Sequence, residues 1–371
     1  MALFTVHDEA LLSAARTAVR ESLKIKKDET VLIITNPNAD VLAISQALYN
    51  ECEAVGARPV MTVQPEKTSL DFTEPSVLGA IKTAPDVLIS MSSEKMGKDF
   101  EAIRHPYEFE GKKIDNTFHY LMKQKKTRSF WSPGVTKDLF VKTVPVDYAE
   151  MKKRCRLLKS FLDRADGVRI QTAAGTDLKL GLRNRIAFTD DGDFSVPGEG
   201  GNLPAGEAFI SPELGTGEGI LVFDGSIAVR NGTVKIDTPI RCTVRGGFVT
   251  AIEGGKEAEI LRKTVEAGES DSAQMAAKGT LPPETAAEYR KNARNLGELG
   301  IGVNPAAFIS GNMLIDEKAF ETCHIAIGSN YDEDAQALIH LDGVILKPTI
   351  TAFFADGSEA MLLDNGRIVC G

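Results

Sequence analysis

The sequence predicts an α/β N-terminal domain with a parallel sheet, followed by a β-rich α+β C-terminal domain. In the first part of the chain, helical periodicity alternates with short runs rich in β-branched residues, which is typical of a parallel sheet covered by helices. From Gly167 onward, short alternating stretches are broken by Asp-Gly and Asn-Gly pairs, which is typical of antiparallel hairpins. A chain of 371 residues is long enough for two cores. We expect domains at 1–150 and 151–371.

The N-terminal elements have clear boundaries. Helices are expected over 8–25, 40–56 and 76–84, and strands over 31–35, 58–65 and 85–93. The first loop between a strand and a helix reads TNPNAD. It contains neither GxGxxG nor GxxxxGK[ST], the patterns whose backbone N–H groups hold phosphates. Nucleotide binding is therefore not expected.

The C-terminal domain is expected to begin after a joining helix over 146–165. Strands are expected over 168–174, 177–183, 207–212, 219–228 and within 234–255, and helices over 256–278 and 282–295. This organisation describes a β-rich domain into which two helices are inserted.

Composition excludes several classes of partner. The net charge of −9 argues against nucleic acid and against an anionic membrane surface, both of which need an excess of Lys and Arg. No apolar run reaches the roughly 18 residues of a spanning helix, and the N-terminus lacks a basic segment before an apolar one. A cytoplasmic protein is expected. The five cysteines contain no CxxC pair and are expected to be buried thiols.

The residues most suggestive of chemistry lie between Glu298 and Asp342. In a strand, residues two apart project from one face, so His340 and Asp342 would present an imidazole and a carboxylate side by side. That pair suits zinc, cobalt, iron or manganese. Alternatively, His340 is a hydrogen-bonded core histidine and Asp342 opens a turn at Gly343.

Several segments of this half resemble the aminopeptidase T family of metallo-aminopeptidases, in the same order. They are NLPAGEAFISP, EGILVFDGS, GELGIGVNP, DEKAFETCHIAIG and IHLDG, and they extend from about residue 200 to 345. The resemblance implies a homodimeric two-metal exopeptidase that uses zinc, cobalt or magnesium and removes N-terminal, preferably hydrophobic, residues from peptide substrates. It also implies six metal ligands: Glu207, Glu298, His324, Tyr331, His340 and Asp342.

This ligand set is sufficient for two divalent ions bridged by oxygen, which would activate a shared water and polarise the scissile carbonyl. Glu207 or Glu298 is expected to bridge the ions, and Tyr331 to ligate an ion or to stabilise the oxyanion. These three are the expected catalytic residues. The general base stays open among Glu218, Asp224 and Asp332, each of which also suits a surface role.

Two alternatives remain. The 2,5-dihydroxypyridine dioxygenases resemble the same segments and end in a similar His-x-Asp, but hold one iron, have a histidine where Glu298 stands, and lack counterparts of Glu207 and His324. Ligand count therefore favours the aminopeptidase. Members of the aminopeptidase T family also have a longer connection before His-x-Asp, whereas only DEDAQALI separates Tyr331 from His340 in this chain. This shortening is the one feature that favours a non-catalytic ligand-binding protein.

Overall fold

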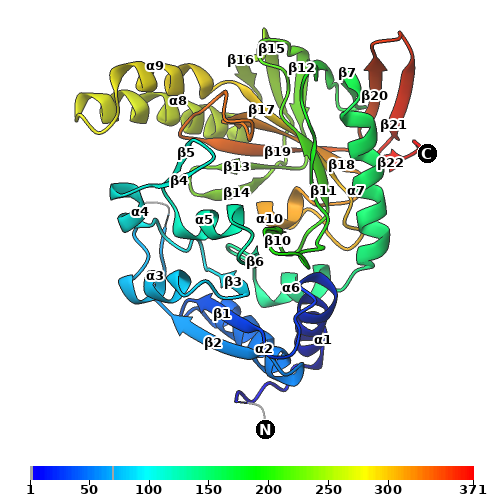
Figure 1. The fold of residues 1–371 in the computed structure, drawn as a ribbon. Helices are drawn as coiled ribbons and strands as arrows, with labels where there is room; N and C mark the ends of the chain where they lie inside the picture. The colour runs from blue at the N-terminus through cyan, green and yellow to red at the C-terminus, as the bar shows by residue number, and fades with distance from the viewer. Residues whose placement is uncertain (1–2, 69–70) are drawn as a thin grey trace. The chain divides into compact units, whose positions relative to one another are not determined.

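The computed structural model describes residues 3–68 and 71–371, which form two units. The first unit comprises Met1–Lys152 and Asp190–Ala205, and the second comprises Lys153–Thr189 and Gly206–Gly371. The first unit contains a parallel sheet covered by helices, and the second is rich in antiparallel strands (Figure 1). The fold class predicted from the sequence is thus confirmed.

The first unit is built on a five-stranded sheet of order β10-β6-β3-β1-β2, in which every neighbouring pair is parallel. Its elements are α1 (Glu9–Thr17), η1 (Ala18–Ser22), β1 (Thr30–Thr35), α2 (Ala39–Ala54), β2 (Arg58–Val63), α3 (Pro75–Lys82), β3 (Val87–Met91), α4 (Phe100–Arg104), β4 (Tyr107–Phe109), β5 (Lys112–Ile114), α5 (Thr117–Lys123), β6 (Arg128–Trp131), α6 (Lys137–Thr143) and β10 (Gly200–Asn202).

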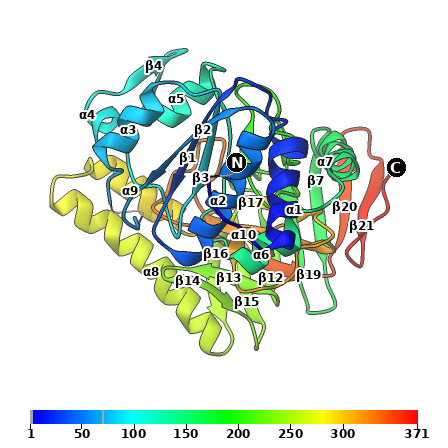
Figure 2. The same ribbon diagram turned by 90° about the horizontal axis from the view of Figure 1, so that it is seen from below.

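Helices cover both faces of this sheet (Figure 2). On one face, Leu32 of β1 and Leu88 of β3 join a buried cluster with Leu78 of α3 and Phe118 of α5. On the other lie α1, α2 and α6. Burial of both faces explains why the central strands are nearly continuous runs of apolar residues.

Helix α7 (Tyr148–Leu162) leads the chain into the second unit. The remaining elements are β7 (Ala165–Gln171), β8 (Asp177–Gly181), β9 (Phe188–Asp190), β11 (Glu207–Ile210), β12 (Glu218–Phe223), β13 (Ser226–Val229), β14 (Gly232–Lys235), β15 (Ile240–Arg245), β16 (Phe248–Glu253), α8 (Lys256–Ala277), α9 (Pro283–Asn292), β17 (Leu296–Gly302), α10 (Met313–Asp316), β18 (Thr322–Gly328), β19 (His340–Leu346), β20 (Thr349–Phe354), β21 (Glu359–Asp364) and β22 (Arg367–Ile368).

Two sheets organise the second unit. The seven-stranded sheet has the order β14-β13-β19-β18-β17-β11-β9, and the eight-stranded sheet has the order β16-β15-β12-β8-β7-β20-β21-β22. The inserted helices α8 and α9 lie side by side, as both views show (Figures 1 and 2). Every residue of β17 and β18 is buried, so these strands form the centre of the seven-stranded sheet.

Two local features differ from the sequence prediction. The segment Asp190–Ala205, expected in the domain 151–371, belongs to the first unit because β10 pairs with β6 in the parallel sheet. The helix expected over 8–25 is an α-helix that ends at Thr17 and continues as the π-helical turn η1. Within the described residues, no helix is both long and apolar enough to cross a membrane.

Candidate metal centre

Five of the six predicted ligands lie on four neighbouring strands of the seven-stranded sheet, β11, β17, β18 and β19. They are Glu207, Glu298, His324, His340 and Asp342. Paired residues of antiparallel strands project from the same face, as do residues two apart along a strand. Ala326 pairs with Glu298 on one side and with Asp342 on the other. His324 lies two residues before Ala326 on β18, and His340 lies two residues before Asp342 on β19. Glu207 pairs with Gly302, which lies four residues after Glu298 on β17. All five side chains therefore project from one face.

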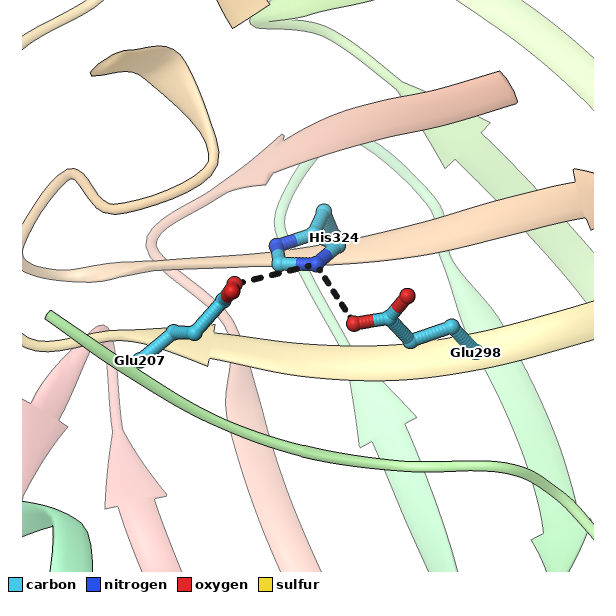
Figure 3. Close-up of side chains that lie close together, drawn as sticks. All are labelled: Glu207, Glu298 and His324. Carbon is cyan, nitrogen blue, oxygen red and sulfur yellow. Dashed lines mark hydrogen bonds and ion pairs between the residues drawn. The ribbon is translucent and has the colours of Figure 1, made fainter. Parts of the chain in front are cut away.

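Gly300 makes room for the imidazole of His324. The two residues are paired across β17 and β18, and a Cβ atom at Gly300 would lie 2.1 Å from both Cε1 and Nε2 of His324. Because the position is a glycine, the ring lies over β17, between the carboxylates of Glu207 and Glu298 (Figure 3).

The five side chains form two overlapping groups of potential metal ligands. In the inner group (Glu207, Glu298 and His324), Nε2 of His324 lies 3.3 Å from Oε1 of Glu298 and 3.6 Å from Oε2 of Glu207. In the outer group (Glu298, His340 and Asp342), Nε2 of His340 lies 3.1 Å from Oε2 of Glu298 and 3.2 Å from Oδ1 of Asp342. Glu298 thus offers one carboxylate oxygen to each group.

The two groups differ in access. The side chain of His324 is 1% exposed, whereas that of His340 is 23% exposed. The His340 ring of the outer group is therefore partly exposed to solvent, whereas the inner group is closed off from it.

The charges of the site are strongly coupled. Burial raises the pKa of Glu207 to about 8. Burial also opposes ionisation of Glu298, but hydrogen bonding with His324 and His340 outweighs it and lowers the pKa of Glu298. Burial disfavours the charged form of His324, yet the facing Glu298 carboxylate raises the imidazole pKa to about 9. The pKa of His340 is raised well above its ordinary value, because Asp342 and Glu298 outweigh burial. A metal ion entering the site must displace these protons.

The donor set fits a divalent metal ion. Oε2 of Glu207, Nε2 of His340 and Oδ1 of Asp342 are buried, and each faces another titratable side chain of the site. Buried charged groups that meet one another in this way need protons or a metal ion between them. Nδ1 of His340 lies 2.8 Å from the carbonyl oxygen of Ser329, which orients the ring and leaves Nε2 as the ligand atom. Imidazole with two carboxylates suits ions such as iron(II), manganese or zinc.

Tyr331, the sixth predicted ligand, lies in a row of aromatic rings beside the outer group. Its ring centroid is 5.3 Å from that of His340 and 5.2 Å from that of Phe209, which in turn stacks on Phe188 at 5.5 Å. The short 332–339 segment therefore brings Tyr331 next to His340. Tyr331 and Phe188 are 54% and 41% exposed, so this aromatic row (Phe188, Phe209 and Tyr331) is open to solvent.

The three candidates for a general base belong to neither group. Glu218 accepts a hydrogen bond from the backbone N–H of Gly246, and Asp224 accepts one from that of Leu346. Asp332 lies 3.7 Å from Nη1 of Arg185. Each therefore has a structural partner, and the role of general base for any of them stays a prediction.

Two further charged residues of the site, Glu317 and Lys318, were not predicted from the sequence; they directly follow α10. Lys318 is fully buried, and its ammonium donates to Oε1 of Glu207 at 2.5 Å and to Oε1 of Glu317 at 2.7 Å. Burial raises the pKa of Glu317. The charged triplet Asp-Glu-Lys before a buried strand was the available signal.

Comparison with known proteins places these residues in context. A family model described as 2,5-dihydroxypyridine 5,6-dioxygenase (NicX) matches residues 133–325, just over half of the chain. A curated 2,5-dihydroxypyridine 5,6-dioxygenase of Pseudomonas putida is 31% identical over 111 residues. That match covers 30% of this chain and spans about a third (32%) of the relative's length. The family match includes Glu207, Glu298 and His324 and ends before His340.

Two solved structures share the fold. The 2,5-dihydroxypyridine dioxygenase of Pseudomonas putida KT2440 superimposes with a TM-score of 0.71 and 16% identity, covering 99% of each chain. Wild-type AmpT of Thermus thermophilus superimposes with a TM-score of 0.64 and 18% identity, covering 97% of this chain and 99% of that one. At these identities, the likeness shows the fold alone.

The enzyme class predicted from the sequence is wrong. The family model and the curated relative are dioxygenases, which are oxidoreductases, so the assignment as a hydrolase, aminopeptidase and protease is not supported. The likeness to AmpT supports only the fold. The error came from counting ligands: a site rich in carboxylates and imidazoles holds divalent ions for many reactions, and the number of donors does not identify the reaction.

Proposed function

Since this chain belongs to the family of 2,5-dihydroxypyridine 5,6-dioxygenases, we propose that it is a metal-dependent dioxygenase that opens a hydroxylated aromatic ring. The family's name gives the substrate class, a dihydroxylated nitrogen heterocycle. The outer group would hold the metal ion, with Glu298, the partly exposed His340 and Asp342 as its ligands.

The observation that carries this proposal is the convergence of the outer group next to an exposed aromatic row. Nε2 of His340 lies 3.1 Å from Glu298 and 3.2 Å from Asp342, and the ring of Tyr331 lies 5.3 Å from that of His340. A planar aromatic substrate binds best where rings can stack on it and where polar groups at its edge meet charged partners. Both features occur together here.

Each residue around the outer group would have its own role in the reaction. The Ser329 carbonyl holds the His340 ring so that Nε2 faces the carboxylates of Glu298 and Asp342. Glu298 and Asp342 supply negative charge and can accept protons that leave the substrate's hydroxyl groups. Tyr331, which packs on Phe209, would stack against one face of the substrate ring. When bound, a redox-active ion such as iron(II) would supply the centre at which the substrate and dioxygen are brought together.

The identity of the ion follows from this reaction class. The resemblance to the aminopeptidase T family implies two ions of zinc, cobalt or magnesium, but reaction with dioxygen favours iron(II), which can change oxidation state. We therefore propose iron(II) in the outer group. The donor set has one imidazole and two carboxylates, whereas the common set in non-haem iron oxygenases is two imidazoles and one carboxylate. The additional carboxylate would lower the reduction potential of the ion.

The test is oxygen uptake by protein loaded anaerobically with iron(II). With 2,5-dihydroxypyridine, we expect one dioxygen consumed per substrate, loss of the aromatic absorption band, and both atoms of labelled dioxygen in the product. His340→Ala should abolish uptake, and a monohydroxylated pyridine should not react. Absence of uptake with every dihydroxylated pyridine and benzene tested, by protein that has retained its iron, would contradict the proposal.

Two earlier expectations stay predictions. A homodimer was expected from the resemblance, and light scattering coupled to gel filtration would measure the mass against the 40.0 kDa of one chain. The cytoplasmic location would be measured by fractionation of the native host.

A further inference from the structure

Lys318 places a fixed positive charge at the inner group. Its side chain is fully buried, and its ammonium contacts one oxygen of Glu207, the carboxylate that the inner group also needs as a metal ligand. We propose that the Lys318 ammonium is the resident cation of the inner group, so that the chain retains one divalent ion, in the outer group, rather than two.

The geometry of Glu207 leads to this inference. Lys318 binds Oε1, while Oε2 faces Nε2 of His324 at 3.6 Å. A metal ion bound through Oε2 would therefore share one buried carboxylate with an ammonium group. Two cations bound to the two oxygens of one carboxylate lie close together, and away from water they repel each other strongly. An ammonium also satisfies a buried carboxylate without any metal, because it supplies both charge and hydrogen-bond donors.

In the outer group, Glu298 and Asp342 form ion pairs with the imidazoles of His324 and His340. The charge of Lys318 also acts on Asp342, but less strongly than that of His340. An imidazole can release its proton and become a metal ligand, whereas an ammonium cannot serve as a ligand until it is deprotonated. The two groups have similar donors but differ in their counter-ion. The outer group is therefore open to a metal ion, and the inner group is already neutralised.

The experiment counts bound metal and rests on the proposed function only for the location of the first ion. Metal-free protein is loaded with excess cobalt(II), passed through a desalting column and analysed for cobalt per chain, with the visible absorption of bound cobalt(II) recorded. We expect wild type to retain one ion and Lys318→Met to retain two, because methionine keeps the length of the side chain and removes its charge. Lys67→Met is the matched control, since Lys67 forms a comparable ion pair with Glu74 in the first unit; it should retain one ion.

A second variant keeps the test decisive if Lys318→Met does not fold. Glu207→Gln removes an inner-group ligand while leaving an oxygen that can accept from Lys318. It should retain one ion, as wild type does. Two ions in wild type, loss of an ion in Glu207→Gln, or a single ion in folded Lys318→Met would each overturn the role of Lys318 and leave the proposed function standing. Retention of no ion by wild type would overturn both.

Discussion

Buried polar groups behave differently in the two units. In the first unit, Asn36 is 1% exposed, and its side chain donates to the carbonyls of Gln64 and Pro65 and accepts from the backbone N–H of Ser93. In the second unit, Glu298 is 3% exposed but faces only other titratable side chains. The first arrangement is complete without a ligand, and the second is not.

The difference shows how burial should be interpreted. A buried polar side chain whose donors and acceptors are all used stabilises the fold, and its removal costs stability alone. Buried charges that face one another with unsatisfied atoms need protons or a metal ion to be tolerated. Only the second arrangement indicates chemistry.

The largest expected effect comes from comparing Glu298→Ala with Asn36→Ala. Glu298→Ala removes a ligand shared by both groups, so bound metal should fall to a small fraction of the wild-type content and oxygen uptake should fall by about 1000-fold or more. Asn36→Ala should lower the free energy of unfolding by roughly 1–3 kcal/mol and leave the metal content unchanged. Elemental analysis measures the metal content of each variant, and denaturant unfolding measures its free energy of unfolding. Equal metal content in the two variants would show that the buried Glu298 contributes no more to metal binding than the buried Asn36.

The next largest effect is expected at Gly300. A methyl group there collides with the His324 ring, so Gly300→Ala should displace an imidazole that hydrogen-bonds with Glu298. We expect metal affinity to fall about 10–100-fold, the range seen when the partners of metal ligands are removed. Gly79→Ala is the control, because a Cβ atom at Gly79, in α3, meets no atom within 4 Å. Isothermal titration with metal ion would measure both affinities, and an unchanged affinity for Gly300→Ala would contradict the tight packing of the ring.

A smaller effect concerns pH. His324 has a folded-state pKa of about 9, above the usual 6.5, so its contribution to stability is full below pH 6.5 and is lost as pH rises through 9. Glu207, raised to about 8, has the same sign: its contribution is full below about pH 4.5 and is lost as pH rises through 8. Metal-free protein should therefore lose on the order of 5 kcal/mol between pH 6.5 and 9.

Metal-loaded protein should lose less over this range, because the ion replaces the protons as counter-charge. Thermal unfolding with and without metal at pH 6.5, 7.5 and 9 would measure the difference. A gap between the two forms that narrows as pH rises would contradict this account of the site.

The smallest effect is expected in the aromatic row. Tyr331→Leu and Phe188→Leu each remove a ring that could stack near the substrate, and a ring pair contributes about 0.5–1.5 kcal/mol. KM for the aromatic substrate should rise about 2–10-fold in Tyr331→Leu and less in Phe188→Leu, which lies two rings from His340. Steady-state kinetics would measure this gradient. A larger effect at Phe188 than at Tyr331 would place the substrate elsewhere.

Much of this arrangement could be predicted from the sequence. Alternation along a strand was sufficient to pair His340 with Asp342, and the structure places Nε2 of the one 3.2 Å from Oδ1 of the other. Hairpin punctuation predicted a β-rich second half. These are local rules, in which the residues that meet are close in sequence or share a regular period.

The features that could not be predicted depend on tertiary contacts. Lys318 meets Glu207 across 111 positions of sequence, and its place in the segment DEKAFETCHIAIG does not reveal this contact, because a lysine is not an expected metal ligand. The three-residue strand β10 has the sequence Gly-Gly-Asn, which carries no β signal, and its place beside β6 is decided by packing. The reaction class could not be predicted from the ligand residues either, since hydrolases and oxygenases use the same donors.

The late return of β10 to the first sheet has a consequence for biosynthesis. As the chain leaves the ribosome, residues 1–152 can form four parallel strands, but β6 then presents an unpaired edge until Gly200–Asn202 has emerged. A nascent chain stalled between these points would expose that edge to other chains. A gene fragment that stops near residue 152 should therefore yield aggregation-prone protein. A fragment extended to Ala205 contains β10, which can pair with the edge of β6.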